Sequence, residues 1–160
     1  MQINFKTERE RFIWLAAMID SEGWFIIECH NVKRRSNKSY HAKFGLKIRE
    51  KEILEIIKEI CLNKGSIRKI EFDNPKWSTI YSYDLNTKTL EVILPLVYPF
   101  LIAKKNQAKI LLEAMDILKE LRISGGYRWE KDGKKNIEKK HKKLQLLKEK
   151  INKCNRGVNK

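Results

Sequence analysis

Two carboxylates at the end of a predicted helix are the residues of this sequence best placed to do chemistry. Asp20 and Glu22 stand immediately before Gly23, at the end of an apolar segment. The C-terminal end of a helix carries the negative end of the helix dipole, so acidic side chains there are unfavourable unless a positive group lies close. A divalent cation would supply that charge, because hard cations bind carboxylate oxygens. The alternative is that both carboxylates accept hydrogen bonds from loop amides.

The helix that would present these acids begins at Thr7. Thr7 and Glu10 form the pattern of a capping box, in which each side chain binds the backbone N–H of the other residue. The apolar residues that follow surround most of the helix, which predicts burial on more than one side. Ala17 and Ser21 lie four residues apart and are small enough to let a second backbone approach. Gly23 readily takes a positive φ, which suits it to ending the helix.

Beyond Gly23 the hydrophobic period changes from that of a helix to that of a strand. Two hairpins are predicted, from strands at 24–32 and 40–48 and at 66–72 and 79–85. Further helices are predicted at 52–62, 87–97 (capped by Thr87), 99–122 and 136–153. The first hairpin has one apolar face and one face with His and Lys, which is typical of a sheet covered on one side. This order predicts an α+β protein with the arrangement αββαββα.

The charge of the chain predicts an anionic partner. Its 160 residues include 35 Lys or Arg against 20 Asp or Glu, a net charge of +15, and residues 128–160 alone hold 13 against 4. Nucleic acid is the commonest partner for such a balance. The three cysteines, Cys29, Cys61 and Cys154, lack metal-site spacing and indicate reduced thiols. With no predicted signal peptide or membrane span, we expect an intracellular protein of a microbial cytoplasm or an organelle (chloroplast or mitochondrion), and not a secreted one.

Residues 15–23, Leu-Ala-Ala-Met-Ile-Asp-Ser-Glu-Gly, resemble the motif of the LAGLIDADG homing endonucleases. Five positions match, and Glu22 keeps the carboxylate of the penultimate acid. A second stretch, residues 97–108, resembles another part of this family and contains Lys104. The resemblance implies a single domain over residues 1–160, with a saddle-shaped antiparallel sheet. Its core would cover about 8–122, and a basic helical extension would follow at 123–160.

The resemblance also implies roles for individual residues. Glu22 would be the catalytic acid that binds Mg²⁺, and the backbone carbonyl of Ser21 would be a further ligand; Mn²⁺ or Ca²⁺ could occupy the same site. Lys104 would stabilise charge near the phosphate or the attacking water. Asp20, the less certain catalytic acid, would help the helix end and the partner subunit. Glu50 stands close to where relatives have a polar residue, commonly Gln.

Cleavage of both DNA strands needs at least two such acids, and the chain holds one copy of the motif. We therefore expect a homodimer whose motif helices pack around a two-fold axis. The expected interface consists of Ile13, Ala16, Ala17, Asp20 and Ser21. The uncovered sheet face would bind a long, pseudo-palindromic double-stranded DNA site. The expected DNA contacts are Ile26, Glu28, His30, Arg34, Arg35, Lys38, Lys43, Lys47, Arg68 and Tyr83.

Two other functions fit the same fold. The first is a maturase that binds its own intron RNA, which the basic C-terminal region suits equally well. The second is a DNA-binding regulator without catalysis, although such a protein has no need of an acid at Glu22. A basic ribosome-associated protein is a more distant alternative, because it does not explain a buried helix that ends in acids.

Overall fold

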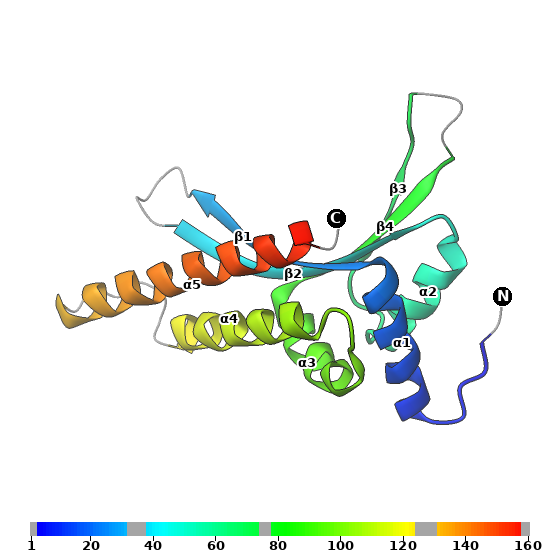
Figure 1. Cartoon of the computed structure of the whole chain (residues 1–160), viewed down its shortest axis with the longest axis horizontal. Helices are drawn as coiled ribbons and strands as arrows, with labels where there is room; N and C mark the ends of the chain where they lie inside the picture. Colours follow the sequence, from blue (N-terminus) through cyan, green and yellow to red (C-terminus); the bar gives the residue numbers. More distant parts are fainter. Residues whose placement is uncertain (1–2, 32–37, 74–77, 124–130, 158–160) are drawn as a thin grey trace. The chain divides into compact units, whose positions relative to one another are not determined.

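The computed structural model describes residues 3–31, 38–73, 78–123 and 131–157. Helices and strands follow one another in the predicted order, and Figure 1 shows them coloured along the chain. In sequence they are α1 (Glu8–Glu22), β1 (Gly23–Asn31), β2 (Lys38–Ile48), α2 (Lys51–Ile60), β3 (Ser66–Ile70), β4 (Ile80–Leu85), α3 (Thr87–Val97), the 3₁₀ helix η1 (Tyr98–Phe100), α4 (Lys105–Ile123) and α5 (Lys131–Gly157). None of the helices in these described ranges is long and apolar enough to cross a membrane.

The strands form one four-stranded sheet in the order β1-β2-β4-β3. Strand β4 pairs antiparallel with β2 on one side and with β3 on the other. The second hairpin is therefore joined to the first through its later strand. This arrangement confirms the predicted α+β class and the αββαββα order.

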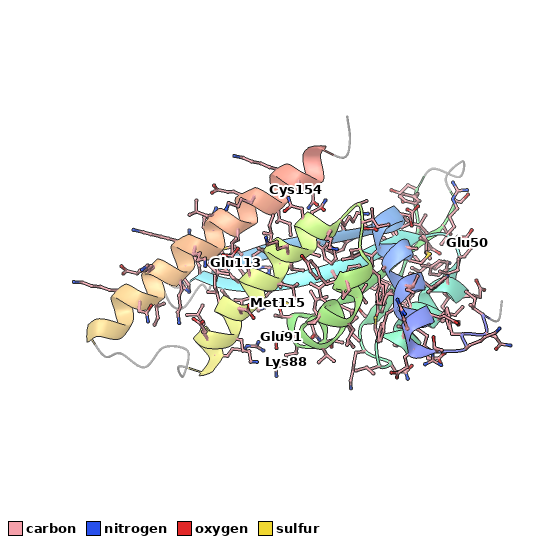
Figure 2. All side chains as sticks on the ribbon, turned by 60° about the horizontal axis from the view of Figure 1, so that its bottom comes forward. Glu50, Lys88, Glu91, Glu113, Met115 and Cys154 are labelled. Carbon is pink, nitrogen blue, oxygen red and sulfur yellow. The ribbon has the colours of Figure 1, made fainter. Side chains whose placement is uncertain are left out.

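The chain divides into two compact units. One consists of Met1–Trp24 and Lys43–Lys105, and the other of Phe25–Ala42 and Asn106–Lys160. In the first unit α1 packs against α2 and α3, around a core that includes Leu15, Ile19, Phe44, Leu46, Leu54, Ile57, Leu90 and Leu94. In the second, the core includes Phe25, Ile27, Ala42, Ala108, Leu111, Met115 (labelled in Figure 2), Leu144, Leu147 and Ile151.

Helix α1 begins as predicted but with half of the expected capping box. The Thr7 side chain accepts a hydrogen bond from the backbone N–H of Glu10 at 3.1 Å. The Glu10 carboxylate accepts instead from the backbone N–H of Lys6 at 2.7 Å. The cap of α3 also differs from the prediction, because Asn86 rather than Thr87 is its N-cap residue and accepts from the backbone N–H of Thr89.

The predicted helix over 99–122 is wrong in its first turn. Residues 98–100 form the 3₁₀ helix η1, and α4 begins only at Lys105. The backbone N–H groups of Ile102 and Lys104 donate to the carboxylate of Asp20, so they are engaged outside any helix. The last helix, predicted over 136–153, extends at both ends to 131–157.

No residue separates α1 from β1: Glu22 ends the helix and Gly23 begins the strand. The predicted positive φ at Gly23 is wrong, since its φ is −78° and its ψ 160°. Glycine is needed there for space instead. A Cβ at this position would lie 2.8 Å from the carbonyl oxygen of Ile19 and 2.9 Å from its Cα. The close approach of strand and helix backbones therefore excludes any side chain.

Candidate active site and nucleic-acid interface

The carboxylate of Asp20 holds the segment between η1 and α4 against the end of α1. Its Oδ2 accepts the backbone N–H of Ile102 at 2.7 Å, and its Oδ1 accepts that of Lys104 at 2.8 Å. Both oxygens are therefore engaged by loop amides, which is the alternative that the sequence left open. Asp20 therefore positions the segment before α4, and its expected catalytic role stays a prediction.

Lys104 supplies the positive charge that the end of α1 needs. Its Nζ donates to the carbonyl oxygen of Ile19 at 2.7 Å and to that of Asp20 at 2.8 Å. These are among the last carbonyls of the helix, where a cation offsets the negative end of the dipole. Burial lowers the pKa of Lys104, and the nearby charges of Asp20 and Glu22 oppose that shift. The side chain of Lys104 therefore places a cationic group beside Asp20 and Glu22 at the end of α1.

Glu22 differs from Asp20 in its surroundings. Its side chain is exposed at the last position of α1 and makes no hydrogen bond or ion pair with another described residue. The hydroxyl of Ser21 donates to the carbonyl oxygen of Met18 at 3.1 Å. Glu50, labelled in Figure 2, is exposed just before α2, and its side chain makes no capping hydrogen bond to that helix.

The donor groups at this end of α1 suit only part of a metal site. Glu22 offers a free carboxylate, whereas the oxygens of Asp20 are occupied by amide protons. Among the residues that the structure describes, no group of three or more His, Cys, Asp or Glu side chains could hold a metal ion. Mg²⁺ commonly binds through one or two carboxylates, with phosphate and water as its other ligands. Glu22 therefore suits a Mg²⁺ ion whose other ligands include a second acid and a phosphate.

The exposed side of α1 carries small and apolar residues. Ile13, Ala17 and Ser21 follow one another at intervals of four and are exposed; 45% of Ile13 is accessible. Ala16, in contrast, is 1% exposed and packs in the core of its own unit. Its predicted place in a dimer interface is therefore wrong, because a partner could not reach it. The residues of this prediction that are open to a partner are Ile13, Ala17 and Ser21.

In the first unit, three of the expected DNA contacts lie on one face of the sheet. Register places Lys47 of β2 and Arg68 of β3 on either side of Ser82 of β4. Lys43 shares this face with Lys47, because residues two or four apart on a strand point the same way. Arg68 forms an ion pair with Asp84 and remains 67% exposed. Ser82 and Asp84 were not predicted, although their alternation with Tyr83 and Leu85 was a usable signal.

Tyr83 faces the other way. Its side chain is fully buried, and its hydroxyl donates to the carbonyl oxygen of Lys64 at 2.7 Å. We therefore remove Tyr83 from the expected DNA contacts, since a buried ring with a satisfied hydroxyl does not reach a groove. On the opposite face, the Trp24 ring covers Gly45: a Cβ on Gly45 would lie 2.2 Å from Cζ2 of Trp24.

In the second unit, Ile26, Glu28 and His30 alternate along β1 on the face opposite the buried Phe25 and Ile27. His30 Nε2 lies 3.0 Å from Glu28 Oε2. The ring of His41 on β2 lies 5.6 Å from that of His30, and its Nε2 is 2.9 Å from the hydroxyl of Ser39. His41 and Ser39 therefore extend this polar face beyond the predicted set, and the same alternation could have identified them.

The remaining expected contacts come from the hairpin tip. Arg34 and Arg35 lie outside the described residues. Lys38 begins β2 on the same face as the buried Tyr40, and it lines a hollow together with residues of α5. Alternation places Lys38 on the face of β2 opposite His41, and its expected contact with DNA at the hairpin tip stays a prediction.

Comparison with solved structures identifies the fold. The homing endonuclease I-CvuI, in complex with a DNA target, aligns with a TM-score of 0.69 at 16% identity over 92% of this chain and 83% of its own. I-SmaMI bound to uncleaved DNA aligns with a TM-score of 0.68 at 20% identity over 95% of this chain and 46% of its own. The LAGLIDADG homing endonuclease I-GzeII, in complex with its DNA target, gives 0.57 at 24% identity over 74% of this chain and 37% of its own. No protein-family model and no curated protein sequence matches the chain.

These relationships place the chain in a structural class. It has the fold of the LAGLIDADG homing endonucleases, as the motif in α1 predicted. The chain spans most of I-CvuI but less than half of I-SmaMI and I-GzeII. At this level of identity the agreement concerns the fold, so the roles of individual residues rest on their geometry here.

Proposed function

We propose that this protein is a site-specific DNA endonuclease that cleaves both strands of a long pseudo-palindromic site as a homodimer. The observation that carries the proposal is the contrast between the two acids of α1. Each carboxylate oxygen of Asp20 accepts a backbone N–H of the segment before α4, whereas Glu22 is exposed near Lys104 and accepts none from the described residues. An exposed acid at a helix C-terminus has no structural benefit, so its presence favours a chemical role.

In this proposal a bound Mg²⁺ would supply positive charge for phosphodiester hydrolysis. Glu22 would hold the ion together with the backbone carbonyl of Ser21. Lys104 would keep the end of α1 in place and lend positive charge to the negatively charged phosphate. Asp20 would position Lys104 through its backbone N–H. A divalent ion is supported by I-CvuI, which was solved with the I-CreI target in Mg²⁺, where the DNA was not cleaved, and with its own target in Ca²⁺.

The homodimer is supported by the exposed side of α1. Ile13, Ala17 and Ser21 form a stripe that a second copy of α1 could approach closely, and this would bring two Glu22 side chains together. Helix α3 packs against α1 in the same unit and exposes Val92 and Leu96, which are 51% and 45% accessible. Exposed apolar residues on both helices suit association with a second copy.

DNA binding is supported by the basic sheet face. The first unit presents Lys43, Lys47 and Arg68 on one face of its strands. By itself, the second unit presents Ile26, Glu28 and His30 on one face of β1. Lysine and arginine would bind phosphates or guanine, and the other side chains would contact base edges. The DNA complexes of I-CvuI and I-SmaMI agree with this partner. An intracellular location and intron RNA as a further partner stay predictions.

The test is cleavage of a large randomised duplex pool with Mg²⁺, followed by sequencing of the cut ends. We expect one enriched, near-palindromic sequence for the wild type and none for Glu22→Gln, while both proteins retain DNA binding. Glu59→Gln, an exposed glutamate of α2, is the matched control and should cleave like the wild type. Cleavage by Glu22→Gln at the wild-type rate would remove Glu22 from the active site. Absence of cleavage by every protein, with binding intact, would favour the non-catalytic regulator.

A further inference from the structure

A hollow of about 420 Å³ lies between β2 and α5 within the second unit. Its lining residues are Lys38, Tyr40, His141, Lys142, Gln145 and Leu146. The proposed DNA contacts of the same hairpin, Glu28 and His30, alternate with the core residues and so lie on the other face. The hollow is therefore separate from the surface proposed for duplex DNA.

Two rings pack together at this hollow, where Tyr40 is buried at 6% exposure and His141 is partly exposed. The centroids of Tyr40 and His141 are 5.5 Å apart, with planes inclined at 57°. The Tyr40 hydroxyl donates to Oε1 of Gln145 at 3.4 Å, and burial is the main cause that raises its pKa to about 12. Burial and the charge of Lys38 lower the pKa of His141, which favours the neutral form of its ring. Leu146 adds an apolar side chain that is 58% exposed.

The outer side of α5 continues from the hollow as a row of lysines. We call this set the α5 ridge; it consists of the exposed residues Lys135, Lys139, Lys142, Lys150 and Lys153. Their spacing places them on one side of the helix over roughly 27 Å. The other side is occupied: Lys140 pairs with Glu120 at 3.0 Å and Lys143 with Glu113 at 2.8 Å, both on α4. Figure 2 labels Glu113 on α4.

The α5 ridge has little acidic charge to balance it. Two exposed acids, Glu138 and Glu149, lie beside these five lysines, and the carboxylate of Glu149 accepts a hydrogen bond from Nε2 of Gln145 at 3.0 Å. No ion pair of the five ridge lysines occurs among the described residues, whereas the lysines that face α4 are paired. A row of unpaired cations complements a phosphate backbone.

We propose that the hollow and the α5 ridge together bind a single-stranded nucleic acid. One unpaired base would enter the hollow and stack on the partly exposed His141 ring beside Leu146, and the flanking phosphates would lie on Lys38, Lys142 and the rest of the ridge. A duplex keeps its bases paired and stacked, so it could use the lysines but not the hollow. Aromatic platforms beside a cationic groove are the usual means of binding unpaired strands. The proposal uses neither Glu22 nor the sheet face and goes beyond the proposed cleavage.

The test is fluorescence anisotropy with labelled oligo(U), oligo(dT) and a random duplex. We expect Lys142→Glu and Leu146→Glu each to weaken single-strand binding about 10-fold, as loss of one stacked base or its phosphate contact would. Both positions are exposed, so neither change should disturb the fold. Lys119→Glu, an exposed lysine on α4, is the control for the change in net charge and should cost about 2-fold or less. Tighter binding of oligo(U) or of oligo(dT) would identify RNA or DNA as the natural strand.

Specificity of the site is tested by competition. Saturating unlabelled duplex should leave most of the oligo(U) or oligo(dT) bound, because the duplex cannot fill the hollow. Complete displacement by duplex would overturn the proposal. Equal losses for Lys142→Glu and Lys119→Glu, or equally good displacement by poly-glutamate, would also overturn it, because either result reduces the surface to a general attraction for anions. Glu22→Gln should bind single strands like the wild type, which separates this proposal from that of cleavage.

Discussion

Asp20 and Lys104 bind each other through two different pairs of atoms. The side chain of Asp20 accepts the backbone N–H of Lys104 at 2.8 Å, and the side chain of Lys104 donates to the backbone carbonyl of Asp20 at 2.8 Å. This reciprocal contact joins the end of α1 to the segment before α4. It fixes the last turn of the helix, and with it the position of Glu22.

Loss of either partner should therefore destabilise the protein. We expect Asp20→Ala and Lys104→Met each to lower the free energy of unfolding by about 1–3 kcal/mol, because each leaves polar groups without a partner. The double variant should cost less than the sum of the two, since both changes break the same contact. Urea denaturation measures all three. Glu22→Gln is the control and should change stability by about 0.5 kcal/mol or less; strictly additive losses would contradict the reciprocal contact.

The dimer proposal predicts that Ile13→Asp abolishes self-association. A carboxylate on the exposed stripe of α1 would be buried without a partner in the interface. Size-exclusion chromatography with light scattering should show half the wild-type mass at equal protein concentration. Leu62→Asp is the matched control, because Leu62 is another exposed apolar residue of the same unit at 58% accessibility. If both variants keep the wild-type mass, the stripe is not the interface.

Gly45→Ala should disturb the sheet through Trp24. The new methyl group would lie 2.2 Å from Cζ2 of Trp24, so the ring must leave its present position. We expect a loss of about 1–3 kcal/mol in the free energy of unfolding. Adding Trp24→Leu to Gly45→Ala should restore much of this loss, because a smaller side chain clears the methyl group. A double variant as unstable as the sum of both changes would show that the contact with Trp24 is not the cause.

We expect ionisation of the buried Cys61 thiol to lower the free energy of unfolding at alkaline pH. Burial raises the pKa of its thiol from 9.0 to about 11 in the folded protein. The folded state therefore holds this proton where the unfolded state has released it, and the resulting stability is complete below pH 9 and lost as the pH rises to 11. At pH 10 the loss from this group should reach about 1.4 kcal/mol. Urea denaturation at pH 8 and pH 10 measures it, and Cys61→Ala should show a correspondingly smaller change.

The element order and the two faces of the first hairpin were predictable because their signals are local. Strict alternation along residues 24–32 and 40–48 separates core residues from polar ones, and it correctly placed Phe25, Ile27, Phe44 and Leu46 inside. The acids at the end of α1 were also recognisable, since their position conflicts with the helix dipole. In each case neighbouring residues alone carry the information.

Other features depend on contacts between distant parts of the chain. The motif helix is apolar nearly all round, so periodicity could not show that Ala16 is buried and Ala17 exposed. Tyr83 suits either face of a strand, and its burial with the hydroxyl donating to the carbonyl of Lys64 shows which face it takes. The partner of Asp20 lies more than 80 residues away in sequence, which is why the break before α4 was missed.

Because α1 and β1 join directly, the fold should not tolerate the insertion of a single residue at this junction. Side chains of a strand alternate between faces, so one added residue after Glu22 would turn Phe25 and Ile27 outward and bring Ile26 and Glu28 toward the core. A deletion would have the same effect. Only an even number of added or removed residues after Glu22 would keep the side chains of the polar face on that face. We therefore expect related sequences to vary in length here by even numbers of residues, or to vary at other connections between helices and strands.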